Sequence, residues 1–326
     1  MKFSLKLVCA AVLASSLVGA SANAVTLRIG HNAPAEDPRT WAAEQFAKHV
    51  DELSSGEIKA KIFPSGQLGD TKEMLEGLKM RTLDIFMDDI GTLGVYGDVP
   101  NLAWVPFLYR DEKHYFGVMQ SDLGRKILDQ VEQETGYKPL GFMYRGGRDI
   151  SSVKPIKTAE DFKGLKIRVP SSPIMIEGFK KMGASPVAMA FTEVFGSLQR
   201  KVIDAQENPI DLIYTSSLYE VSPYIVISEH VYGAYNFIMF GKRFDSLSKE
   251  EQEIVNKAAD MVSKEYNERV TAMLQEKLEQ LKSKEGVDVF VLSGEDKAKL
   301  AAGMDEVINE NYPSIMPLVK EIRAFK

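Results

Sequence analysis

The sequence is poor in the residues that hold metals and disulfides, with one cysteine and four histidines in 326 residues. Cys9 lies in an apolar N-terminal run behind Val8, so it lacks the small preceding residue expected before a lipid-modified cysteine. The remaining chain can therefore form neither a disulfide nor a thiolate metal site. The histidines show no metal-ligand spacing; they are His31, His49, His114 and His230. We expect no metal, no cofactor, and a fold that depends on its apolar core.

Catalytic motifs are also missing. The sequence has no nucleophile elbow, phosphate-binding loop or dinucleotide fingerprint. Asp88 and Asp89 are adjacent, so on a strand their side chains would diverge and could not easily act as an acid/base pair. We therefore expect a protein that is not an enzyme. A secreted enzyme acting on an anionic substrate stays as an alternative of another class.

Basic residues are fewer than acidic ones. The chain has 40 Lys and Arg against 46 Asp and Glu, a net charge of −6. Removal of an N-terminal segment containing Lys2 and Lys6 would bring the net charge to −8. Nucleic-acid binding needs a basic footprint, so we expect no nucleic-acid partner.

Only one apolar run is long, at residues 7–20, and it is shorter than a bilayer span. Lys2 and Lys6 precede it, and Ala22, Asn23 and Ala24 form an A-x-A cleavage site. We predict that residues 1–24 are a signal peptide cleaved after Ala24, and that the mature protein is periplasmic.

Strand and helix patterns alternate along the mature chain, which predicts an α/β fold with a largely parallel sheet. Strand patterns occupy residues 26–31, 58–63, 83–87, 138–143, 202–207, 224–231 and 235–240. Residues 144–148 interrupt the pattern, and we place the first crossing between two domains there. We predict domain I at 25–145 plus about 234–273, and domain II at 146–233 plus about 274–326.

Residues 248–284 contain no Gly or Pro and keep one apolar helical face. A continuous helix of this length would span on the order of 50 Å at about 1.5 Å per residue. Because this length exceeds one ordinary domain, the segment predicts a helix that runs along both.

Polar residues recur just beyond strand patterns, where ligands bind in open α/β sheets. Arg168 follows a short strand, and its planar guanidinium suits a carboxylate, although a solvated edge residue is an alternative. Asn208 precedes Pro209, so it could instead cap a helix. The full set of such residues is Asn32, Asp89, Arg148, Arg168 and Asn208.

Several linked segments resemble the extracytoplasmic solute-binding subunits of TRAP transporters, the tripartite ATP-independent periplasmic systems. They are Gly-Leu-Lys-Ile-Arg-Val-Pro (164–170), Met-Gly-Ala-Ser-Pro-Val-Ala-Met-Ala-Phe-Thr-Glu-Val-Phe (182–195) and Asp-Ala-Gln-Glu-Asn-Pro (204–209). Residues 64–69, 146–148 and 218–221 fit the same family. The resemblance covers essentially the whole mature chain.

This resemblance implies a periplasmic-binding-protein-like fold, with two α/β domains around a ligand cleft and a long helix spanning both. It implies that Arg168 forms a salt bridge with a substrate carboxylate. Arg148 and Asn208 would add hydrogen bonds, Phe191 would form a wall, and Asn32 and Asp89 would be first-domain contacts. Relatives that bind sialic acid carry a longer acid at the Asp89 position, which weakens the transfer of that ligand.

The resemblance also implies partners: a small and a large TRAP membrane subunit driven by an ion gradient. We expect the receptor itself to be a monomer. His31, Asp88, Asp89 and Arg145 would suit a hydroxylated acid, so we favour a sugar acid such as a uronate or aldonate. A C4-dicarboxylate is the main alternative for the ligand. Service to an ATP-driven importer or a sensor is an alternative for the partner.

Overall fold

The computed structural model describes residues 25–326, so the predicted signal peptide and its cleavage site lie outside the described residues. These residues form a nine-stranded sheet in the order β2-β1-β3-β8-β4-β7-β5-β6, with β9 (Asp288–Val291) paired to β8. One half is parallel and contains β1 (Val25–Gly30), β2 (Ile58–Phe63) and β3 (Ile85–Asp88). The other half is also parallel and contains β5 (Lys166–Val169), β6 (Ser185–Ala188) and β7 (Ala205–Pro209).

Two long antiparallel strands join the halves: β4 (Tyr137–Ser152) and β8 (Tyr224–Phe240). The predicted strand at 138–143 continues to Ser152, and the two predicted strands at 224–231 and 235–240 are one strand, so these predicted strand limits were wrong. Gly141 and Gly146 have φ angles of +70° and +83°, and the β4–β8 ladder has register shifts around them. Such bulges interrupt the alternation of side chains without ending the strand, because pairing resumes beyond them. The sheet is therefore parallel in its halves and antiparallel at its centre.

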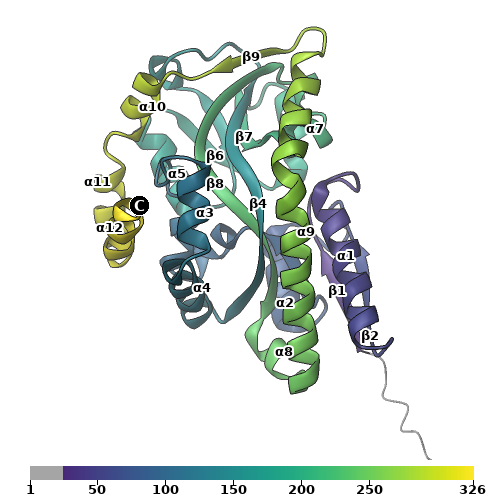
Figure 1. Ribbon diagram of the computed structural model, residues 1–326. Helices are drawn as coiled ribbons and strands as arrows, with labels where there is room; N and C mark the ends of the chain where they lie inside the picture. Colours follow the sequence, from purple (N-terminus) through teal and green to yellow (C-terminus); the bar gives the residue numbers. More distant parts are fainter. Residues whose placement is uncertain (1–24) are drawn as a thin grey trace, which may run out of the picture.

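Helices cover the sheet (Figure 1). In the first part of the chain they are α1 (Pro38–Leu53), α2 (Thr71–Met80), α3 (Glu112–Met119) and α4 (Asp122–Thr135). Later helices are α5 (Pro173–Lys181), α6 (Val194–Gln199), α7 (Ile210–Thr215), α8 (Gly241–Asp245), α10 (Gly294–Ala301), α11 (Met304–Asn311) and α12 (Met316–Ala324). The 3-10 helices are η1 (Ile90–Val95), η2 (Val99–Trp104), η3 (Ala159–Phe162), η4 (Phe191–Glu193), η5 (Leu218–Glu220) and η6 (Pro313–Ile315).

The remaining helix, α9 (Lys249–Lys282), is continuous over 34 residues, as the sequence predicted. A capping box between Ser248 and Glu251 begins it. Its buried face packs against β4, α1 and α7, so it contacts elements of both halves. Figure 1 shows α9 running beside the long strands. No helix of residues 25–326 combines the length and the apolar character needed to cross a membrane.

The apolar core has two parts. The larger cluster extends from β1 and α1 through the centre of the sheet to α5 and the C-terminal helices. The smaller one gathers around α6, α7 and the end of α9, and its fully buried members include Val194, Ile213 and Leu281. Burial of such side chains is the main favourable term in folding. Because the larger cluster crosses the sheet, the long strands are anchored in both halves.

The C-terminal helices contact both halves. Helix α11 packs on α5, whereas Arg110, just before α3, donates hydrogen bonds to the backbone oxygens of Arg323 and Phe325. His114 of α3 lies 2.9 Å from the Ile322 oxygen. The domain boundaries proposed from the sequence stay a prediction, and this last segment touches elements assigned to each domain.

Side chains of α9 bond to the bulged part of β4. The Asn267 side chain accepts a hydrogen bond from the backbone nitrogen of Tyr144 at 2.8 Å and donates one to the oxygen of Phe142 at 2.7 Å. We predict that Asn267→Ala lowers the free energy of unfolding by about 2 kcal/mol, because two backbone groups lose their partner. Chemical denaturation measures this change. Gln275→Ala is the control, because that exposed side chain bonds only to Glu279, and equal stabilities of the two variants would contradict the prediction.

Candidate functional site

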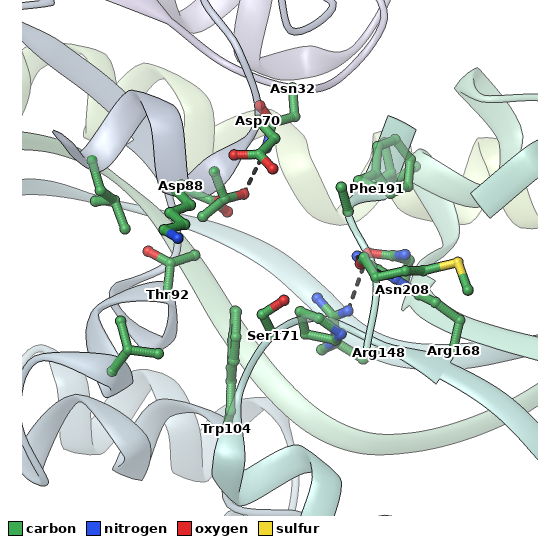
Figure 2. A pocket seen from close by; sticks show the side chains of 18 of the residues that line it. Asn32, Asp70, Asp88, Thr92, Trp104, Arg148, Arg168, Ser171, Phe191 and Asn208 are labelled. Carbon is green, nitrogen blue, oxygen red and sulfur yellow. Dashed lines mark hydrogen bonds between the residues drawn. The ribbon is translucent and has the colours of Figure 1, made fainter. Parts of the chain in front are cut away.

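A cleft of about 490 Å³ lies where the two halves of the sheet meet β4. Figure 2 shows its two walls. The first half contributes Asn32 after β1, Asp70 at the cap of α2, Asp88 at the end of β3 and Thr92 within η1. The second half contributes Arg168, Ser171, Phe191 and Asn208, while β4 contributes Arg145 and Arg148. The cleft is therefore lined by strand ends and by the loops that follow them, as expected for an α/β sheet.

Arg168 lies in β5, on the second wall, and is only 4% exposed. Its Nε and Nη2 atoms donate hydrogen bonds to the Met189 oxygen at 3.1 and 2.9 Å. It forms no salt bridge within residues 25–326. Burial, which disfavours the charged form, lowers the pKa of its guanidinium to about 10. At neutral pH Arg168 is thus a buried cation without a counter-ion, and an anion in the cleft would stabilise it.

Arg148 differs from Arg168 because it already has a carboxylate partner. Its guanidinium forms a bidentate pair with Glu207 of β7, and its Nη2 also donates to the Asn208 side-chain oxygen at 3.1 Å. His230 Nε2 lies 3.3 Å from the same Glu207 carboxylate. Burial by itself disfavours the Glu207 anion, but Arg148 and His230 outweigh burial and hold its pKa at about 2. The fork of Arg148 is therefore fixed in direction by an ion pair.

Asn208 is the last-but-one residue of β7, not the cap of a helix. Helix α7 begins at Ile210, after Pro209. The Asn208 amide donates to the Gln206 side chain at 2.6 Å and accepts from Arg148. Both bonds orient the amide on the cleft wall, where Figure 2 shows it beside Arg148.

Aromatic side chains flank the arginines. The Phe191 ring, in η4, lies 5.9 Å from the Arg168 guanidinium carbon, and the Trp104 ring lies 5.8 Å from that of Arg148. Both rings line the cleft. The family resemblance implied that Phe191 is a wall residue. Trp104 also belongs to the core, since it is 4% exposed and packs its ring against Gly91.

On the first wall the structure brings only part of the predicted set to the cleft. Asn32 lines it and donates to the Thr71 hydroxyl at 2.7 Å. His31 and Asp89 do not line it. His31 is fully buried against Thr40, and Asp89 caps η1, accepting from the backbone nitrogens of Gly91 and Ala234. Side chains alternate along a strand, so the residue on the cleft is Asp88, the last of β3, and its neighbour faces backward.

Arg145 lines the cleft beside Asp88, at what we call its inner end, and is 2% exposed. Its Nη1 atom is 4.0 Å from the Asp88 carboxylate, and its guanidinium carbon lies 4.4 Å from the Tyr235 ring. Burial raises the pKa of the neighbouring Asp89 to about 6, although the charge of Arg145 opposes this effect. The inner end therefore holds one cation, Arg145, close to two acids, and Asp89 is more deeply buried than Asp88.

Several residues that line the cleft were not predicted from the sequence. Arg39 and Asp70 belong to the starts of α1 and α2, and Thr92 belongs to η1. A turn-and-cap pattern at residues 64–73 could have indicated that α2 begins near a strand end. Nothing in the sequence indicated Arg39, because its place depends on how α1 packs. Among residues 25–326, no group of three or more His, Asp or Glu is arranged to hold a metal ion.

Comparison with known proteins gives a consistent result. The model of bacterial extracellular solute-binding protein family 7 matches residues 29–314. The sialic acid-binding periplasmic protein SiaP of Vibrio cholerae is 32% identical over 279 residues, covering 86% of this chain and 87% of the relative. The match therefore extends over both walls of the cleft.

Solved structures agree with this match. A TRAP periplasmic solute-binding protein from Haemophilus influenzae with bound L-gulonate has a TM-score of 0.87 and 27% identity, covering 93% of this chain and all of that one. A second, from Sulfurospirillum deleyianum with bound succinate, has a TM-score of 0.86 and 28% identity, covering 93% and 99%. The two-domain fold around a ligand cleft is shared with both.

The ion pair beneath the cleft gives a pH-dependent prediction. We expect Glu207→Gln to lower the free energy of unfolding at pH 7 by about 3 to 5 kcal/mol, because the substitution leaves the buried Arg148 charge unpaired. The Glu207 pKa is about 2 in the fold against an ordinary value of 4.5. Its contribution is therefore complete above pH 4.5 and is lost as the pH falls toward 2. Denaturant unfolding across this range measures the difference.

The control for this prediction is Glu295→Gln, since that side chain is 81% exposed. It should leave stability nearly unchanged at every pH. A Glu207→Gln protein as stable as the wild type at pH 7 would mean that Arg148 does not need the carboxylate.

Proposed function

Because the chain belongs to bacterial extracellular solute-binding protein family 7, we propose that its cleft captures a small organic carboxylate, with a sugar acid such as a uronate or aldonate as the favoured ligand. Members of this family bind solutes in the periplasm for TRAP transporters and are not enzymes. This chain is accordingly a TRAP-type solute-binding protein. The proposal concerns the ligand and the residues that bind it.

The observation that supports the proposal most is that Arg168 is a buried cation with no carboxylate partner among residues 25–326. A buried guanidinium without a counter-ion is unfavourable, and a ligand carboxylate would supply two acceptor oxygens in the geometry of its fork. Arg148 and Asn208 lie on the same wall and can add hydrogen bonds to the same group. Phe191 would cover one face of the carboxylate.

The charges of the other lining arginines are already matched. Arg148 pairs with Glu207, and Arg39 pairs with Asp37 at 2.8 Å. Arg145 has Asp88 at 4.0 Å. One uncompensated cation on the second wall therefore favours a ligand with one carboxylate.

The first wall carries the acids Asp70, Glu76 and Asp88, together with Lys72 and the Asp37-paired Arg39. Asp70 and Asp88 line the cleft there, opposite the second-wall arginines (Figure 2). Carboxylates accept hydrogen bonds from sugar hydroxyls but repel a second carboxylate. This polarity favours a hydroxylated monocarboxylate over a C4-dicarboxylate. The C4-dicarboxylate stays the second candidate, because a related structure contains succinate.

The last part of the proposal concerns how the bound ligand is delivered to the membrane transporter. Contacts from a ligand to both walls would favour a closed form over an open one, through hinge motion of the two domains. We propose that the closed receptor is a monomer that engages a small and a large TRAP membrane subunit. We also propose cleavage after Ala24, which is supported by the A-x-A pattern and by the start of β1 at Val25.

The anion clamp is tested by Arg168→Ala. A thermal-shift screen with D-glucuronate, D-galacturonate, L-gulonate and succinate first identifies the acid that stabilises the mature protein most. We expect the substitution to weaken binding of that acid by roughly 2 to 5 kcal/mol in calorimetry, because it leaves a desolvated carboxylate unpaired. Arg200→Ala is the control, since Arg200 is exposed in the same half. Near-unchanged affinity of Arg168→Ala would refute the clamp.

Asp88 tests the choice between ligand classes. We expect Asp88→Asn to reduce the ratio of affinities for sugar acid over succinate by about tenfold. The substitution removes the repulsion of a second carboxylate while keeping an acceptor oxygen for hydroxyl groups. The ratio of dissociation constants for L-gulonate and succinate measures this preference. A wild-type protein that binds succinate more tightly than every sugar acid would favour the second candidate instead.

A further inference from the structure

A buried cluster of polar groups lies behind the inner end of the cleft, where the two halves meet. Asp211 of α7 is at its centre and is 0% exposed. Its Oδ1 accepts a hydrogen bond from the Leu212 nitrogen, whereas its Oδ2 has no hydrogen-bond partner among residues 25–326. Leu212 itself lines the cleft. Asp211 is thus one residue away from the cleft wall, with one carboxyl oxygen left unpaired.

Charged and titratable groups from four parts of the fold act on Asp211 or on its neighbours. The β1–α1 region contributes His31, Asp37 and Arg39, while β4 contributes Arg145, β8 contributes Tyr235 and α9 contributes Tyr266. Among them, Arg145 Nε and the hydroxyls of Tyr235 and Tyr266 also have no hydrogen-bond partner among the described residues. The cluster therefore contains buried polar groups that do not use all of their hydrogen-bonding capacity within the described residues.

Neither nearby arginine bonds to the Asp211 carboxyl. Arg39 directs its Nε and Nη2 atoms to Asp37, at 2.8 and 3.3 Å. Arg145 has its guanidinium against the Tyr235 ring and Asp88. The negative charge of Asp37 also acts on Asp211. An ionised Asp211 would be a buried anion without a donor for one oxygen, and such a group binds a proton instead.

We propose that Asp211 is protonated up to about neutral pH and that this proton lets its carboxyl stay buried near Asp37 of the β1–α1 region, so that closure on a solute is linked to proton uptake. The proton comes from solvent and binds the unpaired Oδ2, which makes the carboxyl neutral. Asp37 belongs to the first half and Asp211 to the second. Opening the cleft would separate them and hydrate Asp211, which would weaken proton binding, so the ligand-free protein should release this proton at a lower pH than the ligand-bound protein.

Burial raises the pKa of Asp211 to about 7, and the charge of Asp37 raises it further against the opposing effects of Arg145 and Arg39. An ordinary aspartate has a pKa near 3.8. The folded protein therefore binds one more proton than the unfolded chain between about pH 4 and pH 7. The contribution of Asp211 to the free energy of unfolding must therefore fall as the pH rises from about 4 to about 7.

The ligand-free protein tests the proton directly. Asp211→Asn mimics the neutral acid, so its melting temperature should rise relative to the wild type as the pH increases from 5 to 8. The infrared difference spectrum of wild type minus Asp211→Asn should show a protonated-carboxyl band at pH 6 that disappears by pH 8. No such band, or an Asp211→Asn protein less stable than the wild type at every pH, would overturn the proposal.

A second variant keeps this test decisive if Asp211→Asn does not fold. Asp37→Asn leaves the Asp211 proton in place but removes the negative charge that raises its pKa. The protonated-carboxyl band should then disappear at a lower pH than in the wild type. A band that titrates at an unchanged pH would show that it belongs to another group.

Proton uptake on binding rests on the proposed function and is measured separately. Calorimetric titrations with L-gulonate and D-glucuronate, in buffers of different ionisation enthalpy, report the protons taken up per ligand. We expect uptake near pH 7.5, and affinity that falls by up to about tenfold per pH unit above pH 7. Both effects should vanish in Asp211→Asn. Failure of all acids to bind would refute the proposed function, whereas the ligand-free spectra would still decide the state of Asp211.

Variants of two other buried acids test whether the proton taken up belongs to Asp211. Asp89 is buried beside Asp88, outside the cleft lining, and burial raises its pKa to about 6, so it could also take up a proton. Uptake that persists in Asp211→Asn and disappears in Asp89→Asn would overturn the assignment. Asp149→Asn is the matched control: burial raises the Asp149 pKa to about 7, but its carboxylate bonds to Ser228 and Glu229, away from α7. It should leave ligand-linked uptake unchanged.

Discussion

The cost of burying charge governs this cleft. Three arginines at its inner end and second wall are each less than 5% exposed. Arg148 is held by Glu207 and Arg145 lies near Asp88, whereas Arg168 touches only a backbone oxygen. Because a guanidinium cannot lose its proton at neutral pH, the remaining charge has to be matched by something that enters the cleft. On the proposed function, selectivity for an anion would follow from one missing carboxylate rather than from a large positive field.

The long elements make this arrangement possible. Strands β4 and β8 continue through both halves of the sheet, and α9 packs along them. The register shifts near Gly146 let β4 change direction without breaking, so that Arg145 and Arg148 reach the cleft from one strand. The same central position places Asp211 between the halves, which is why a proton there would respond to their separation.

Much of the candidate site could be predicted. Arg168, Arg148, Asn208, Phe191, Arg145 and Asn32 all line the cleft, and most of them follow or end strands with clear patterns. The resemblance to a known family selected them from other polar strand ends. Asp89 and His31 were misplaced because adjacent side chains alternate, and local sequence does not reveal which of two neighbours faces inward. Arg39 and Trp104 were missed because helix packing, not a motif, brings them to the wall.

The sequence by itself determined the α/β class, the long helix, the lack of cysteine chemistry in the mature chain and the acidic net charge. These properties depend on local periodicity and composition, which need no knowledge of distant contacts. Only the tertiary structure decided that β4 and β8 are single strands, that Asp88 rather than Asp89 faces the cleft, and which arginine has no carboxylate partner in the described part of the chain. The physical reason is that ion pairing and burial depend on residues far apart in the chain: Arg148 meets Glu207, 59 residues away, whereas no carboxylate of residues 25–326 pairs with Arg168.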